Sequence, residues 1–387
     1  MRRDPEQERR PRVGIACDPR VREGYLAPAD LARLEAFAEV RFADVTGQWS
    51  TTDPPPNDPE AEQALAEFAA DLDALVVCHG APLVSGAVLS AAPRLRAVGD
   101  LEGDRFGARI DVAAATARDV AVIDTTHGSS YPVAEWALAL AIIGLRDAAR
   151  RFRALMTDAP HRKGDVARPR ELTGRTVGLI GFGHIAWRLV ELLAPFDVDL
   201  VAHDPYAPRE LADALGMTYA PLDVVLSAGE VVICLAPLTP KTRGMLGARE
   251  LDLLRPGCVF VNVSRGAIVD TAALVARLRR DDIVACLDVH DPEPIPVDAA
   301  VRGLPNVFLS PHIAGTTVES RTRFFQLMVH ELERVFAGAE PRAMLTSRIV
   351  SVRNGADPSG TANPSGTANP SGTANPSGTA NPSGGEP

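Results

Sequence analysis

The chain has 387 residues, of which 46% are hydrophobic, so it is long enough for two domains with buried cores. Its formal net charge of −10 at pH 7 disfavours a nucleic-acid surface, which needs clustered cations. The N-terminus mixes charges of both signs without an apolar run, which disfavours a signal peptide and predicts a cytoplasmic protein.

The N-terminal part alternates short apolar strands with Ala-rich helices, which is the pattern of an α/β domain. Strands are predicted at 13–17, 74–78, 97–99 and 120–123, and helices at 29–38 and 59–72. We therefore predict one small doubly wound domain over residues 11–126.

The apolar run 133–145 is predicted to be a buried connecting helix. It contains Glu135 and is shorter than the roughly 20 residues that a membrane span needs. We therefore expect no association with a membrane.

The next strand, which begins at Thr176, runs straight into a glycine-rich turn. Gly181, Gly183 and Ala186 form the pattern G-x-G-x-x-A. The first glycine permits the tight turn, the second lets a pyrophosphate approach, and the small alanine lets helix and strand pack closely. This pattern predicts a dinucleotide-binding site.

Asp204 follows the second strand after this turn, where an acid that binds a ribose hydroxyl is expected. A carboxylate there accepts a hydrogen bond from a free 2′-hydroxyl and repels a 2′-phosphate. The sequence therefore favours NAD over NADP, while the nearby Arg209 leaves NADP open.

Six strands are predicted in this second part, beginning near 176, 200, 231, 259, 284 and 307, as in a dinucleotide-binding domain. A helix over 318–337 follows, and its apolar stripe needs a surface to pack on. The tail from Asp357 repeats Pro-Ser-Gly-Thr-Ala-Asn and has no large apolar side chain, and residues 352–387 are predicted to be disordered. Tether, partner-binding segment and neutral repeat all remain open for this tail.

Three later strands each end near a reactive side chain, at the edge where parallel sheets bind ligands. These side chains are Arg265, Glu293 and His312. A guanidinium binds a carboxylate bidentately, and a carboxylate stabilises a protonated imidazole, which can then donate a proton to a carbonyl. Alone, each has a simpler explanation: a surface ion pair, a turn residue and a loop cap, respectively. Only their convergence would make them catalytic.

Together these motifs resemble the D-2-hydroxyacid dehydrogenase family over residues 13–337. The resemblance rests on the fingerprint with Asp204 and on the segments 235–243, 261–270, 287–294 and 310–315. It implies that Arg265 orients the substrate carboxylate and carbonyl, that His312 is the general acid and base, and that Glu293 supports His312.

The resemblance also implies a set of cofactor-binding residues and an architecture. Asp288 is similar to the residue that holds the nicotinamide carboxamide. The implied fold has a flavodoxin-like substrate domain, residues 11–126 completed by 316–345, and a Rossmann NAD-binding domain, residues 127–315. The resemblance also implies a cleft between the domains that closes by hinge motion. The implied oligomer is a homodimer. The expected cofactor-binding residues are Gly181, Gly183, His184, Ile185, Asp204, Ala236, Pro237, Ser264, Asp288 and Gly315.

The chain departs from the family in the substrate loop 99–111, which is longer and more charged than the usual glycine-rich loop. Gly103 is predicted to keep the amide contact with the substrate. Arg105 or Arg109 adds an anion contact or pairs with Glu102 or Asp104 of the same loop.

We predict an enzyme that uses NAD to interconvert a small 2-oxoacid and its D-2-hydroxyacid, with no metal site. The alternative is a dinucleotide-sensing, corepressor-like interaction protein with little catalysis, because fold alone does not fix function.

Overall fold

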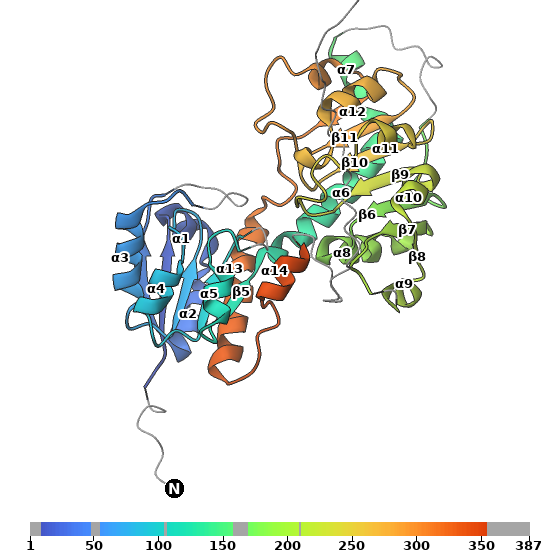
Figure 1. Ribbon diagram of the computed structural model, residues 1–387. Coiled ribbons are helices and arrows are strands. Elements are labelled where there is room, and N and C mark those ends of the chain that lie inside the picture. The colour runs from blue at the N-terminus through green and yellow to red at the C-terminus, as the bar shows by residue number, and fades with distance from the viewer. Residues whose placement is uncertain (1–8, 48–54, 104–106, 158–168, 209, 354–387) are drawn as a thin grey trace, which may run out of the picture.

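The computed structural model describes residues 9–47, 55–103, 107–157, 169–208 and 210–353. It contains two parallel β-sheets with helices packed on them, which form two halves joined by α6 (Ser130–Leu145) (Figure 1). The predicted α/β fold class with two doubly wound sheets is confirmed. The predicted tail lies outside the described residues from 354 onward, and α14 (Ser347–Arg353) includes its first two positions.

The first sheet has the strand order β2-β1-β3-β4-β5, which is the flavodoxin-like order. Its strands are β1 (Arg12–Cys17), β2 (Glu39–Asp44), β3 (Ala74–Val77), β4 (Ala97–Asp100) and β5 (Ala121–Asp124). The sequence reading missed β2, because this edge strand mixes charged and apolar residues and is only partly buried. The other four strands are as predicted within a few residues.

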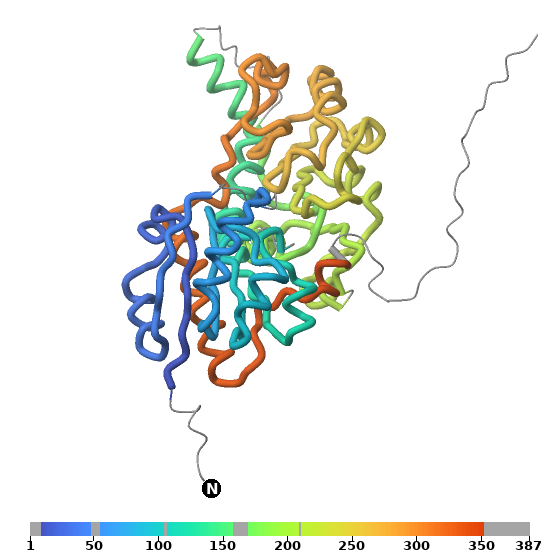
Figure 2. The backbone as a smooth tube through the Cα atoms, turned by 60° about the vertical axis from the view of Figure 1, so that its left-hand side comes forward, coloured from blue at the N-terminus to red at the C-terminus, as the bar shows by residue number. Residues whose placement is uncertain are grey.

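Helices cover both faces of this sheet, and two separate core layers result. These helices are α1 (Pro19–Tyr25), α2 (Pro28–Phe37), α3 (Pro59–Ala69), α4 (Gly86–Ala91), α5 (Val112–Thr116) and α13 (Val318–Phe336). Phe324 and Phe325 of α13 lie in the same buried core cluster as Val13 and Ile15 of β1. The predicted apolar stripe therefore packs on the first sheet, and Figure 2 shows the C-terminal part of the chain returning beside the N-terminal strands.

The second sheet has the order β12-β11-β10-β9-β6-β7-β8. Counted from β6, this is the Rossmann order with one added strand. Its strands are β6 (Thr176–Ile180), β7 (Asp199–His203), β8 (Thr218–Tyr219), β9 (Val231–Cys234), β10 (Val259–Asn262), β11 (Val284–Leu287) and β12 (Val307–Leu309). The two-residue β8 was not predicted, because so short a strand leaves no apolar run.

The helices of the second half lie on both faces of this sheet, and they too enclose two core layers. They are α7 (Ala148–Met156), α8 (His184–Leu193), α9 (Glu210–Leu215), α10 (Leu222–Ala228), α11 (Ala248–Asp252) and α12 (Thr271–Leu278). Asp270 caps α12 by accepting a hydrogen bond from the backbone of Ala273 at 2.9 Å, as its position in the sequence suggested.

The connecting helix α6 packs against α8 and the second sheet. Ala134, Ala137, Leu140 and Ala141 are fully buried, and Gly144 lets the helix approach Val259 of β10. Within the described residues, the stretch containing this helix is the one with the length and hydropathy of a membrane span. Its burial is that of a core helix, as predicted.

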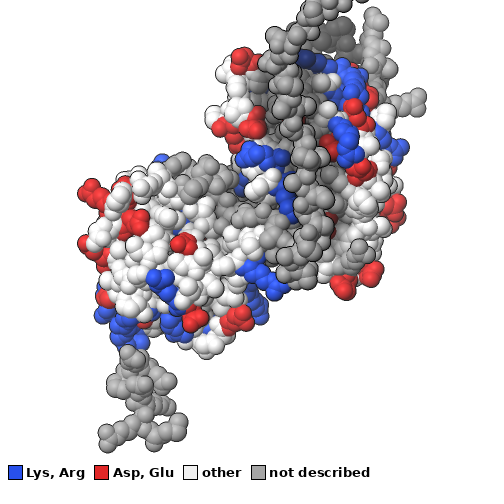
Figure 3. Space-filling view, in the orientation of Figure 1, with Lys and Arg blue, Asp and Glu red and all other residues white. Residues whose placement is uncertain are grey.

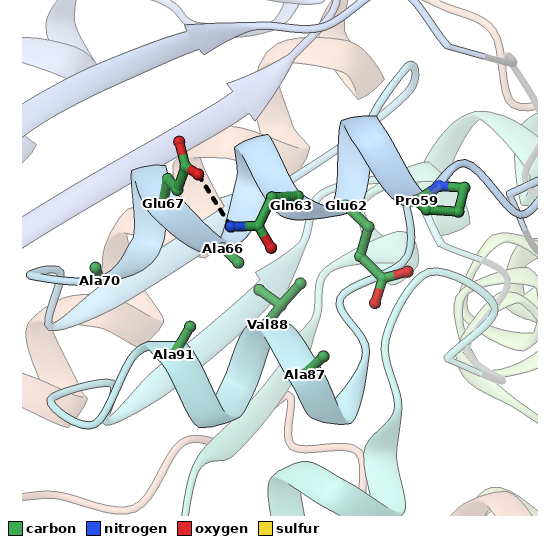
Figure 4. Close-up of a pocket in the computed structure, with 9 residues that line it drawn as sticks. All are labelled: Pro59, Glu62, Gln63, Ala66, Glu67, Ala70, Ala87, Val88 and Ala91. Carbon is green, nitrogen blue, oxygen red and sulfur yellow. Dashed lines mark hydrogen bonds between the residues drawn. The ribbon is translucent and has the colours of Figure 1, made fainter.

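Charged residues and a shallow groove mark the outer surface. Arginines and carboxylates are interspersed over both halves of the face shown in Figure 3. A groove of about 360 Å³ lies between α3 and α4, where Ala66, Ala87 and Ala91 face each other and Gln63 bonds Glu67 at 2.9 Å (Figure 4). This groove is remote in sequence and fold from the reactive strand ends described next.

Candidate active site

The three reactive side chains predicted from the sequence lie at one edge of the second sheet. Arg265 follows β10, Glu293 lies in the loop after β11, and His312 follows β12. These strands are adjacent and parallel, so their carboxyl ends share an edge.

The three loops also touch one another directly. Gly266 lies against the backbone of His290, so closely that a Cβ at this position would overlap the carbonyl group of His290. The ring of His290 in turn bonds the carbonyl oxygen of Ser310 at 2.9 Å. Arg265 immediately precedes Gly266, and its guanidinium donates a hydrogen bond to the carbonyl oxygen of Ser264 at 2.8 Å. The three loops therefore meet at this edge, and the joint action of the side chains of Arg265, Glu293 and His312 stays a prediction.

His312 and Glu293 form the central pair of this edge. Nδ1 of His312 lies 2.6 Å from Oε1 of Glu293, and both side chains are partly exposed. Burial alone would raise the pKa of Glu293, but the hydrogen bond from His312 and the nearby charges of His312 and His290 outweigh it and lower the pKa. The carboxylate is therefore ionised at neutral pH and engages Nδ1, which leaves Nε2 for proton transfer.

The backbone of His312 adopts a conformation that side chains usually avoid. Its φ of 54° lies in the left-handed region. The N–H of His312 donates to the carbonyl oxygen of Asp288 at 2.8 Å, and this bond helps hold the conformation. Strain of this kind persists only where surrounding structure imposes it, and it is concentrated at functional sites.

That surrounding structure is the buried carboxylate of Asp288, which is 0% exposed. Its two oxygens accept hydrogen bonds from Nε1 of Trp136 (3.2 Å), Oγ of Ser310 (2.5 Å), and the backbone amides of Ile313 (3.1 Å) and Ala314 (2.9 Å). Four donors satisfy this buried charge and fix the loop that carries His312. The suggested contact of Asp288 with a nicotinamide carboxamide stays a prediction.

The glycine-rich turn has the shape that a dinucleotide requires. Gly181 has a φ of 91°, and a Cβ there would lie 2.7 Å from backbone atoms of Ala236. At Gly183 a Cβ would meet nothing within 4 Å, so the space in front of the first turn of α8 is open. No side chain caps this helix start, and its amides suit a pyrophosphate.

Asp204 lies at the end of β7, as predicted for the ribose-binding acid, and it also braces the turn. Its Oδ2 accepts a hydrogen bond from the backbone of Phe182 at 2.7 Å, and its Oδ1 accepts one from the backbone of Tyr206 at 2.8 Å. The carboxylate of Asp204 therefore lies next to the glycine-rich turn and helps to hold the backbone of that turn in place. Arg209, which left NADP open, lies outside the described residues.

The remaining predicted cofactor residues surround this turn. Ser264 donates its hydroxyl to the carbonyl oxygen of Ala236, which joins the loops after β10 and β9. Pro237 follows in the same loop, where its carbonyl oxygen accepts a hydrogen bond from Thr242 at 2.6 Å. Ile185 is partly buried against the core of the second half.

His184 and Gly315 lie where the two halves meet. The ring of His184 stacks on that of His127 with 5.2 Å between centroids, beside a cavity of about 760 Å³. His127 belongs to η2 (Thr126–Ser129), the turn that leads out of the first sheet. A Cβ on Gly315 would lie 3.5 Å from side-chain atoms of Ser129 and Val133.

The substrate loop differs from the expectation in the use of its arginine. Arg109 is 2% exposed and donates to Asp100 at 2.8 Å, to the carbonyl oxygen of Glu102 at 2.9 Å and to Nδ1 of His79 at 3.0 Å. It thus pairs with Asp100, a partner the sequence reading did not consider. Arg105 lies outside the described residues.

Gly103, the predicted amide donor, lies between carboxylates. A Cβ on it would lie 2.7 Å from an oxygen of Asp124 and 2.8 Å from one of Asp100. Its contact with substrate stays a prediction.

Sequence reasoning missed the partners that organise both regions. Trp136 and Ser310 hold Asp288, and Tyr25 and His79 hold Glu102. His79 lies two positions after the buried strand β3, and this position at a strand end is a signal that could have singled it out. Tyr25 and Trp136 lie within helices and follow no recognisable pattern.

Comparison with known proteins decides the family. Residues 138–314 match the D-isomer specific 2-hydroxyacid dehydrogenase, NAD binding domain. Over 361 residues the chain is 32% identical to the glyoxylate reductase of Aeropyrum pernix, covering 89% of this chain and 98% of that protein. The chain belongs to the D-isomer specific 2-hydroxyacid dehydrogenase family. The resemblance inferred from the motifs is confirmed.

Solved structures of this dehydrogenase family share the fold. A phosphoglycerate oxidoreductase from Rhizobium etli superposes with a TM-score of 0.73 at 24% identity, covering 87% of this chain and 97% of that one. The NAD-complexed D-isomer specific 2-hydroxyacid dehydrogenase from Lactobacillus delbrueckii ssp. bulgaricus gives 0.67 at 22% identity, covering 87% and 100%. The matched domain and the turn around Gly181 agree on NAD as the cofactor.

Proposed function

We propose that this NAD-dependent dehydrogenase reduces a small 2-oxoacid to its D-2-hydroxyacid and catalyses the reverse reaction. The observation that carries the proposal is the 2.6 Å contact between His312 and Glu293 at the strand edge that also holds Arg265. The name of the Aeropyrum pernix relative, glyoxylate reductase, supports a substrate of this class.

The three residues divide the chemistry between them. NADH, when bound, supplies the hydride that reduces the carbonyl carbon. Arg265 binds the substrate carboxylate and polarises the carbonyl. Nε2 of His312 donates a proton to the carbonyl oxygen as the hydride arrives, and Glu293 stabilises the protonated ring beforehand.

The cofactor residues take the roles implied by their positions. Gly181, Gly183 and the amides at the start of α8 accommodate the pyrophosphate, and Asp204 binds the ribose. We assign residues 11–126 and 316–345 to the substrate domain and 127–315 to the NAD domain. The protein acts as a cytoplasmic homodimer in this proposal.

Kinetics of two variants test these roles. Arg265→Ala is expected to abolish NADH-dependent reduction of glyoxylate and hydroxypyruvate while NADH binding, followed by fluorescence, stays nearly intact. His312→Asn, which tolerates the left-handed backbone, is expected to lower kcat by about 10²-fold or more. Arg279→Ala, at the exposed residue that follows α12, serves as the control and is expected to retain activity. Loss of NADH binding in Arg265→Ala would contradict the role of Arg265.

A further inference from the structure

A polar network lies at the carboxyl end of the first sheet, outside the catalytic set. It consists of Tyr25 at the end of α1, His79 after β3, Glu102 after β4, and Arg109. Tyr25, His79 and Arg109 are 6%, 5% and 2% exposed, whereas the Glu102 side chain is 26% exposed. Glu102 is therefore the member of this network that reaches solvent.

The donors of the network fix how Glu102 is held. A guanidinium only donates, so Nδ1 of His79 accepts from Arg109, and Nε2–H of His79 donates to Oε2 of Glu102 at 3.2 Å. The hydroxyl of Tyr25 donates to the same Oε2. Both donors thus engage one oxygen, and no residue that the structure describes donates a hydrogen bond to Oε1.

The ionisation of the network matches this pattern. Burial, followed by the charge of Glu102, raises the pKa of Tyr25, which therefore keeps its proton and donates. Burial alone would raise the pKa of Glu102, but the hydrogen bonds from His79 and Tyr25 and the charge of Arg109 lower it. Glu102 is ionised at neutral pH.

A hydrogen bond and a close backbone contact connect the loop of Glu102 to the catalytic edge. The carbonyl oxygen of the next residue, Gly103, accepts a hydrogen bond from Thr126 of η2. Ser129, at the other end of η2, lies against Gly315, which follows His312 by three positions. The carboxylate therefore belongs to the junction between the halves into which the His312 loop runs.

The charges around Glu102 favour a substrate group that donates a hydrogen bond over an anionic substrate group. Among the residues that the structure describes, the loop and the adjacent strand ends contribute three carboxylates, Asp100, Glu102 and Asp124, against one guanidinium group, Arg109. A second anionic group on a substrate would be repelled here, whereas a hydroxyl or ammonium group would find an oriented acceptor.

We propose that Glu102 determines substrate choice by accepting, at Oε1, a hydrogen bond from a donor group on the part of the substrate beyond the carbonyl. The inference rests on the proposed function, in which Arg265 binds the carboxylate end. It predicts that the enzyme prefers 2-oxoacids that carry a hydroxyl or ammonium group beyond the carbonyl to their phosphorylated counterparts.

Glu102→Gln tests the assignment with little change in shape. Because His79 and Tyr25 both donate, the amide oxygen must stay on their side, and the NH₂ group takes the place of Oε1. The free position thereby changes from an acceptor to a donor. Glu60→Gln, an exposed change on α3, is the matched control.

The measurement is kcat/KM with NADH for pyruvate, hydroxypyruvate and 3-phosphohydroxypyruvate. In Glu102→Gln, the ratio for hydroxypyruvate over 3-phosphohydroxypyruvate is expected to fall roughly tenfold or more, while the value for pyruvate changes little. Glu60→Gln keeps the wild-type ratio. A parallel drop on all three substrates would indicate a structural role and overturn the proposal, as would an unchanged ratio in an active enzyme.

A binding measurement separates this inference from the proposed function. If the wild type reduces neither these three substrates nor glyoxylate, the proposed function fails. Calorimetric titration of the enzyme with NAD present, using D-glycerate and D-lactate, then still decides the role of Glu102. Preference for D-glycerate that disappears in Glu102→Gln supports it, and equal binding of the two by the wild type overturns it.

Discussion

The indole Nε1 of Trp136 lies 3.2 Å from Oδ1 of Asp288, although 152 positions separate the two residues in the chain. Trp136 belongs to the helix that joins the halves, and Asp288 lies beneath the loop that carries His312. The position of the imidazole therefore depends on a contact with a helix that carries none of the reacting groups.

Trp136→Phe removes the indole donor and keeps an aromatic ring. We expect a loss of about 1–3 kcal/mol in the free energy of unfolding, because a buried carboxylate loses a donor, together with a lower kcat. Chemical denaturation and steady-state kinetics measure the two effects. Trp187→Phe is the control, since the more exposed Trp187 donates only to Glu191 on its own helix. Equal effects of both changes would contradict the importance of the Asp288 contact.

Gly266→Ala tests the contact between the loops that carry Arg265 and Glu293. The added Cβ would overlap the backbone of His290, so the two loops must separate. We expect kcat/KM to fall by about tenfold or more, because misplacement by an ångström is costly in an active site. Gly303→Ala, where a Cβ meets nothing within 4 Å, should leave the kinetics unchanged. Wild-type kinetics in Gly266→Ala would show that the loops tolerate separation.

Asp204→Ser tests the basis of cofactor choice. Removing the carboxylate removes the repulsion of a 2′-phosphate and one acceptor for the ribose. We expect the ratio of kcat/KM for NADH over NADPH to fall by about tenfold or more. Because Asp204 also accepts from Phe182, thermal unfolding should accompany the kinetics. An unchanged ratio in a folded variant would mean that other residues exclude the phosphate.

Glu293 makes the stability of the protein depend on acidity. Its pKa in the folded protein lies below the ordinary value of 4.5, so its ionised form stabilises the fold above about pH 4.5. This contribution is lost as the pH falls through the lowered value. Between pH 6 and pH 3, Tm should therefore fall less in Glu293→Gln than in the wild type. Glu319→Gln, an exposed change on α13, should follow the wild type; a parallel decrease in Glu293→Gln would contradict the prediction.

The sequence could predict those parts of the site that depend on strand ends. Arg265, Glu293 and His312 each follow an apolar strand, and parallel strands bring their ends together whatever lies between them. The partners of Asp288 could not be predicted, because Trp136 reaches it only through the packing of α6 on the sheet. The pairing of Arg109 with Asp100 was likewise hidden, since other carboxylates in the same loop are nearer to Arg109 in sequence.

Within the part of the chain that the structure describes, the backbone passes between the two halves twice, once through η2 into α6 and once from the His312 loop into α13. Gly315 and Ser129, one from each passage, lie side by side. Because these two connections touch, we expect the halves to rotate relative to each other about a single axis near this contact. Side chains near that axis would move little during such a rotation, whereas the distance between Glu102 and Arg265, which lie on opposite halves, would change.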